Sequence, residues 1–405
     1  MNDSSRNKLM AIFLIVLIDV LGMTIMLPLL PFYSERFGAS PFVVGLLVSS
    51  YAICQFISGP ILGYLSDKYG RRPVLIFSQI GTFIGFLILA FSQSLTWIFI
   101  SRVIDGLTAG NISTAQAYIA DHTSPAERTK AMGKISIAFS FGFFIGPAIS
   151  AFLMNISMRA PILLAAALSL TSIIASYKFL KENPREVIPE ERKIIKKNRN
   201  PFSFIMDNFS YLKNKNLQSL FLQIFLFYLA FSAYMSGFAL FAERQLHWKG
   251  SILNPDQIGY AFTYFGLIGI ITQLLVLDFA TKIWKDLKVI AICFFLCVLG
   301  YLLLSRIHDA IFLIFTGLLI SMGSGLIRPL LISEISKNAN PSERGRVIGV
   351  NQSLQSVAQV VAPMFSTYLI QRSLLSMWPI ASAVLSFLGL GFTLFQMKVR
   401  AGKQV

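Results

Sequence analysis

Asp19 is an acid inside a long apolar stretch, FLIVLIDVLGMTIMLPLLP, with no opposite charge near it in that stretch. An acid at the centre of a membrane helix costs roughly 2.5–3.5 kcal/mol to insert, and burial disfavours the charged form of a carboxyl group. Such a group can load and release a proton. The alternative is a structural carboxylate that backbone groups hold where Gly22 and Pro28 loosen the helix.

Arg102 and Asp105 lie in a later apolar stretch, three residues apart. This spacing places them on one face of a helix. They can neutralise each other and be purely structural. Alternatively, Asp105 is a second proton or cation site whose pairing with Arg102 changes during a working cycle. Both interpretations fit the residues equally well.

Arg328 is a further cation deep in an apolar stretch, and Pro329 follows it. An arginine does not readily lose its proton in a protein, so it is a poor proton carrier. It either holds an anionic small molecule or pairs with an acid from another helix. Other polar side chains in apolar stretches either line a cavity or pack between helices: Asn111, Gln116, Tyr234, Gln352 and Gln355.

No metal, cofactor or catalytic constellation accompanies these residues. Cys293 and Cys297 share a helix face, but no further Cys or His joins them, and the three histidines are far apart in the sequence. A nucleotide-binding loop of the G-x-x-x-x-G-K-[ST] type is also missing, which argues against direct ATP hydrolysis. We therefore expect no metal, no cofactor and no enzyme.

The elements that must position these residues are membrane helices. Hydrophobic residues make up 55% of the 405 residues and charged residues 13%, against about 25% charged in a soluble globular protein. A hydrocarbon core about 30 Å thick takes roughly 20 apolar residues per helix, and continuous hydrophobicity favours helices over a barrel. Twelve spans are expected, at 8–33, 43–65, 74–93, 95–121, 131–155, 159–180, 217–243, 257–280, 287–305, 309–336, 346–371 and 375–397.

The basic residues indicate which way these helices cross the membrane. With the N-terminus inside, the cytoplasmic segments hold 27 of the 35 Lys and Arg, and the opposite side holds 6. Cytoplasmic loops carry this excess in membrane proteins. The bias explains the net charge of +16 without nucleic acid, and it predicts that both termini are cytoplasmic.

The chain contains two copies of one half. Segments 124–150 and 340–366 share residues at a constant offset of 216, including Pro125 with Pro341 and Pro147 with Pro363. We therefore expect an N-terminal six-helix bundle at 1–180, a basic cytoplasmic linker at 181–216 and a C-terminal six-helix bundle at 217–405. Parallel halves of this kind suit alternating access around a midplane site.

The loop GYLSDKYGRRP joins the second and third spans on the predicted cytoplasmic side. Gly63 permits a close helix approach, and Gly70 permits a tight turn. Asp67 lies among Lys68, Arg71 and Arg72. A generic basic loop needs neither the acid nor the glycines.

Several of these segments resemble the major facilitator superfamily of transporters. GYLSDKYGRRP resembles its signature loop, and RVIDGLTAG resembles its fourth-helix motif. The segments IDVLGMTIMLPLLP and AYIAD resemble the twelve-helix drug–proton antiporters, the tetracycline efflux proteins in particular. The fifth-helix motif of the proton-linked exporters is similar to a pattern formed here by Gly133, Gly142, Gly146 and Pro147, although Ser150 and Ala151 replace the two glycines that usually end it.

The resemblance implies an all-α membrane protein of twelve transmembrane helices in two pseudo-symmetric six-helix bundles, working by alternating access. It implies that Asp19 contributes to transport, and the intramembrane charges make Asp19, Arg102 and Asp105 the candidates for proton coupling. It also implies that the acid of the signature loop steadies the state that is open to the outside. The expected cytoplasmic gate comprises Gly63, Asp67, Gly70, Arg71, Arg72 and Arg128.

The expected function is therefore proton-coupled export of small amphipathic compounds or drugs. The expected location is the bacterial inner membrane, as a multi-pass monomer whose partners are a small-molecule substrate, protons and membrane lipid. The alternative is a dedicated metabolite or siderophore transporter of the same superfamily, working as an importer or an exporter.

Overall fold

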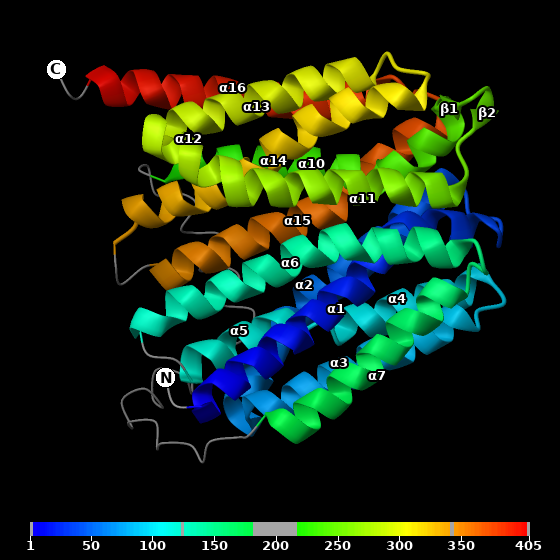
Figure 1. Cartoon of the computed structure of the whole chain (residues 1–405), viewed down its shortest axis with the longest axis vertical. Coiled ribbons are helices and arrows are strands. Elements are labelled where there is room, and N and C mark those ends of the chain that lie inside the picture. Colours follow the sequence, from blue (N-terminus) through cyan, green and yellow to red (C-terminus); the bar gives the residue numbers. More distant parts are fainter. Residues whose placement is uncertain (1–2, 123–124, 181–216, 341–343, 403–405) are drawn as a thin grey trace.

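The computed structural model describes residues 3–122, 125–180, 217–340 and 344–402. These residues form two bundles of roughly parallel helices that lie side by side (Figure 1). The N-terminal bundle contains α1 (Asp3–Glu35), α2 (Pro41–Tyr69), α3 (Arg71–Ala90), α4 (Leu95–Leu107), α5 (Asn111–His122), α6 (Pro125–Met154) and α7 (Ala160–Phe179).

The C-terminal bundle repeats this arrangement with its own helices. It contains α10 (Gln218–Gln245), α11 (Pro255–Ile271), a π-helical turn (Thr272–Val276), α12 (Leu277–Ile283), α13 (Asp286–Leu304), α14 (Leu313–Asn338), α15 (Arg344–Gln371) and α16 (Met377–Gly402). A small hairpin of β1 (His247–Trp248) and β2 (Ser251–Ile252) follows α10, and a short 3₁₀ turn (Ala310–Phe312) precedes α14.

The two ends of the molecule are distinct. Helix α1 begins and α16 ends at one end, which we call the terminal end, and the β1–β2 hairpin lies at the other, the hairpin end (Figure 1). Ten of the described helices are long and apolar enough to cross a membrane. Many large apolar side chains on them are exposed, as a lipid-facing surface requires. The predicted all-α membrane fold is therefore confirmed.

The two remaining crossings in the described part depart from a simple apolar helix. Helix α15 carries polar residues along its length, including Gln352 and Gln355. The span predicted at 95–121 is interrupted between Leu107 and Asn111, so that α4 and α5 form it together. At this break, the Thr108 hydroxyl donates to the Ile104 carbonyl at 2.8 Å, a local bond that competes with the helical pattern.

The bundles meet along two helix pairs, α2 with α15 and α6 with α11. Toward the hairpin end, Ser49 Oγ donates to the Val360 carbonyl at 2.7 Å. The Phe42 amide donates to Gln371 Oε1 at 3.0 Å. At the hairpin end itself, Arg244 of α10 forms a 2.5 Å ion pair with Glu35 of α1. The structure is thus a conformation in which the bundles are closed at the hairpin end.

Candidate functional site

Asp19 lies inside the N-terminal bundle, where α1 faces α7. The Ser172 hydroxyl donates to Asp19 Oδ1 at 3.3 Å, and Gln79 Nε2 donates to Ser172 Oγ at 2.7 Å. The second carboxylate oxygen, Oδ2, is buried without a hydrogen-bond partner among the described residues. A buried polar atom that stays unsatisfied carries a desolvation cost of about 1–3 kcal/mol. An added proton or a bound water removes that cost.

Arg102 and Asp105 face each other on α4, at the spacing that predicts a pair. Arg102 NH1 lies 3.3 Å from Asp105 Oδ2, and both residues are buried. The guanidinium also lies 5.9 Å from the centre of the Phe86 ring. Its NH2 atom has no partner among the described residues, so the pair leaves one strong donor unused. Asp105 is close enough to Asp19 for the two carboxyl groups to repel each other when both are charged.

Glycines let α4 lie against its neighbours at this level. A Cβ on Gly106 would lie 2.6 Å from the Tyr51 carbonyl of α2, and a Cβ on Gly85 of α3 would lie 3.1 Å from the Asp105 Cβ. Real Cβ atoms essentially never approach as closely as 2.6 Å. Close backbone packing through small residues is how membrane helices associate. It holds Arg102 and Asp105 against α2 and α3.

The fifth-helix motif packs against the helix that carries Asp19. The Thr24 hydroxyl of α1 donates to the Gly142 carbonyl at 2.8 Å. A Cβ on Gly142 would overlap Val20, and a Cβ on Gly146 would overlap Thr24. Gly133 and Pro147 belong to the same helix, α6. The small-residue spacing therefore serves the α1–α6 contact rather than a lipid-facing surface.

A second polar group occupies the C-terminal bundle around Arg328. The Arg328 guanidinium of α14 donates to Gln355 Oε1 at 3.4 Å, and the Tyr228 hydroxyl of α10 donates to Asn351 Oδ1 at 3.0 Å. The guanidinium also interacts with that hydroxyl. The structure thus brings together two of the residues expected in the cavity, Arg328 and Gln355, and adds Tyr228 and Asn351.

The other cavity candidates lie in different surroundings. Tyr234 is 2% exposed and its ring stacks on Trp378 at 6.0 Å between centroids, which favours a packing role inside the C-terminal bundle. Asn111 is buried, with Oδ1 unpartnered in the described part of the chain. Gln116 and Gln352 are exposed.

The loop between α2 and α3 lies at the terminal end. Gly70 has a φ of +106°, so the predicted tight turn is present there. Asp67 pairs with Arg71 at 2.6 Å, and Arg72 donates to the Tyr177 carbonyl at 2.6 Å. The close approach expected at Gly63 is absent, because a Cβ there would meet no described atom within 4 Å. The side chain of Arg128 lies outside the described residues.

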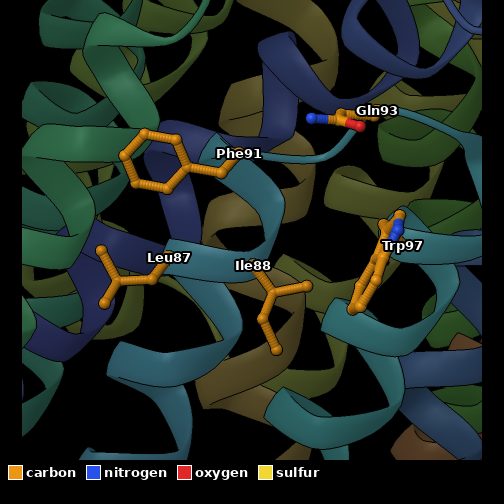
Figure 2. A pocket seen from close by; sticks show the side chains of 5 residues that line it. All are labelled: Leu87, Ile88, Phe91, Gln93 and Trp97. Atoms are coloured by element: carbon orange, nitrogen blue, oxygen red, sulfur yellow. The ribbon is translucent and has the colours of Figure 1, made fainter.

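An apolar pocket lies elsewhere, at the hairpin end of α3. It is lined by Leu87, Ile88, Phe91, Gln93 and Trp97 (Figure 2). Its residues belong to α3, to α4 and to the turn between them, and both helices pack within the N-terminal bundle. None of its lining residues belongs to either polar group, and neither helix belongs to the α2–α15 or α6–α11 pairs along which the bundles meet.

Gln79, Ser169 and Ser172 were not among the residues singled out from the sequence, although Ser172 bonds to Asp19 and Gln79 links the two serines. Gln79 is fully buried, and Ser169 donates to its carbonyl at 3.2 Å. Ser169, Ser172 and Ser176 recur at helical spacing on α7, and all three are buried. These three serines form a polar stripe on one face of an otherwise apolar span, and this pattern in the sequence could have indicated that α7 faces a polar partner.

Comparison with known proteins decides the family. The sequence profile of the Major Facilitator Superfamily matches residues 12–363. The chain belongs to the major facilitator superfamily. As a member of that superfamily, it is a multi-pass membrane transporter of small molecules rather than an enzyme.

Two relatives over nearly the whole length are resistance proteins. The chain is 28% identical over 403 residues to the class B tetracycline resistance protein of Escherichia coli, and the alignment covers 97% of this chain and 94% of the relative. It is 27% identical over 398 residues to multidrug resistance protein 2 of Bacillus subtilis, covering 96% of each.

Solved structures support the fold. The human organic anion transporter MFSD10 superposes with a TM-score of 0.71 at 23% identity, over 96% of this chain and 99% of that chain. A peptide transporter in complex with sulfate gives 0.75 at 15% identity, over 95% and 94%. At these identities the likeness concerns the fold alone.

Proposed function

We propose that this superfamily member is a proton-coupled exporter of small amphipathic compounds. The observation that carries the proposal is the Asp19 carboxylate, which lies in a membrane helix and whose Oδ2 atom is buried and unsatisfied among the described residues. Intramembrane acids of this kind mark proton and ion paths. The tetracycline and multidrug resistance proteins among the relatives support the direction and the substrate class.

The proposal assigns a role to each group of residues. Asp19 carries the proton, and the Arg102–Asp105 pair changes its contacts as the proton comes and goes. The loop containing Gly63, Asp67, Gly70, Arg71 and Arg72, with Arg128, closes the terminal end when the hairpin end opens. Halves at 1–180 and 217–405 move as bodies joined by 181–216, in a monomer surrounded by lipid.

Reconstituted vesicles test the coupling. In a one-to-one exchange, a lumen one pH unit more acidic than the bath should concentrate a substrate up to about tenfold, since one unit is worth 1.36 kcal/mol. Doxycycline and ethidium, measured against protein-free vesicles, are suitable first compounds. Accumulation that instead requires an alkaline lumen would identify a proton symporter. Uptake that no pH gradient alters would exclude proton coupling.

The proposal also places the terminal end in the cytoplasm of a bacterial inner membrane. Six basic residues were counted on the side opposite the cytoplasmic segments, and all of them lie at or beside the hairpin ends of helices: Arg36, Arg159, Arg244, Lys249, Arg306 and Arg372. The excess of Lys and Arg therefore belongs to the terminal end, and the positive-inside rule assigns the end with that excess to the cytoplasm.

Cysteine labelling checks this orientation. We expect an impermeant maleimide to label Ser251→Cys, on exposed β2, in intact cells and to leave Lys178→Cys, at the exposed end of α7, unlabelled until the membrane is opened. The half-buried Cys54 is replaced by serine in both variants. The reverse labelling pattern would invert the topology.

A further inference from the structure

Arg328 is a permanent positive charge at membrane depth. It is the sixteenth of the 26 residues of α14, so it lies about 22 Å along the helix from the hairpin end at 1.5 Å per residue. Its side chain is exposed in this structure. An arginine facing hydrocarbon would be costly, and such residues face the bundle interior or a water-filled space.

The neighbours of Arg328 place it on the side of the C-terminal bundle that faces the other bundle. It contacts Gln355 of α15 and interacts with Tyr228 of α10. Helix α15 packs directly against α2 of the N-terminal bundle. The exposed Gln352 lies three residues before Gln355 on the same helix, so the two extend one polar surface beside the guanidinium.

The charge of Arg328 is not balanced within the described residues. No carboxylate there lies within ion-pair distance of it, whereas the other intramembrane arginine, Arg102, has Asp105 at 3.3 Å. Two acids nearer the terminal end of the same bundle have cations of their own. Glu334 pairs with Arg400 at 2.9 Å, and Asp286 pairs with Lys337 at 2.5 Å.

We infer that Arg328 is the anion-binding residue of the transport site, and that the substrate carries a carboxylate, sulfonate or phosphate group on an apolar body. The inference rests on the proposed transport function and names the substrate class for it. A guanidinium presents paired donors that fit such groups in a bidentate geometry. Charge-assisted hydrogen bonds of this kind are roughly twice as strong as neutral ones. Gln355 and Tyr228 contact the guanidinium, and Asn351 accepts from the Tyr228 hydroxyl.

Matched carboxylates and carboxamides test this on the purified full-length transporter. The compounds are benzoate, naphthalene-2-carboxylate and decanoate, each with its amide, and Kd is measured by calorimetry in detergent. At least one carboxylate should bind at least tenfold more tightly than its amide. Arg328→Gln should remove that preference, and Arg328→Lys should keep part of it. Arg306→Gln, at an exposed arginine of the hairpin end, should change nothing.

Two outcomes would overturn the inference. One is that no carboxylate binds more tightly than its amide. The other is that a preference for the carboxylate survives in Arg328→Gln. If Arg328→Gln does not fold, the wild-type preference and the partial retention in Arg328→Lys still decide. Equilibrium binding needs no gradient, so the two proposals can fail separately. Carboxylate binding through Arg328 without pH-driven transport would refute only proton coupling. A pH-driven neutral or cationic drug without carboxylate preference would refute only this inference.

Discussion

Asp19→Asn should abolish accumulation of substrate against a gradient while exchange of substrate across the membrane continues. The amide keeps the size of the side chain and can still accept from the Ser172 hydroxyl, which lies 3.3 Å from Oδ1. It cannot carry a proton. The driving force is then lost. One charge crossing a potential of 100 mV is worth about 2.3 kcal/mol, or roughly fiftyfold in concentration.

Two measurements on the same vesicles separate drive from exchange. Accumulation under a pH gradient should fall to the level of protein-free vesicles, and exchange of labelled for unlabelled substrate should stay within a few fold of wild type. Asp309→Asn is the matched control, because this exposed acid caps the turn before α14 at 2.9 Å and asparagine can do the same. Proton-driven accumulation that survives in Asp19→Asn would move the proton to another group, and Asp105 would be replaced next.

The parts of the candidate site that follow from local spacing could be predicted from the sequence. Arg102 and Asp105 are three apart on one helix and do face each other. Gly142 and Gly146 are four apart and both meet α1. In each case helical geometry alone brings the two residues to one face. The apolar spans were predictable for the same reason, since their length and composition are local properties.

The parts that depend on contacts between distant segments could not be predicted. Asp19 accepts from Ser172, which itself accepts from Gln79, and these two residues lie 153 and 60 positions from Asp19 on other helices. Gly63 looked suited to a close approach, but whether two helices touch depends on the conformation. In this structure, which is closed at the hairpin end, a Cβ added at Gly63 of α2 would have no described atom within 4 Å. The break in the fourth span was not predicted either, and two residues at it, Thr108 and Gly110, lie against α3.

The contacts that close the hairpin end also show which substitution should stop the cycle. Alternating access requires the bundles to meet and separate there in turn. Gly45 of α2 lies against α15 at this surface. A Cβ at Gly45 would lie 2.8 Å from the Pro363 carbonyl and would overlap the Thr367 side chain, which is fully buried. A backbone oxygen cannot rotate out of the way, so any larger residue must push the two helices apart.

Gly45→Leu should therefore hold the hairpin end open and stop transport, while the substrate still binds. Overpacking a close contact costs typically 1–3 kcal/mol, which changes the ratio of the two states roughly 5- to 150-fold at 1.36 kcal/mol per factor of ten. Spin labels at Arg36→Cys and Arg372→Cys, exposed positions at the hairpin ends of the two bundles, should show a longer distance. Gly391→Leu on α16 is the matched control, because a Cβ there meets no described atom within 4 Å. An unchanged label distance in Gly45→Leu, together with normal transport, would mean that closure of the hairpin end does not require the close contact at Gly45.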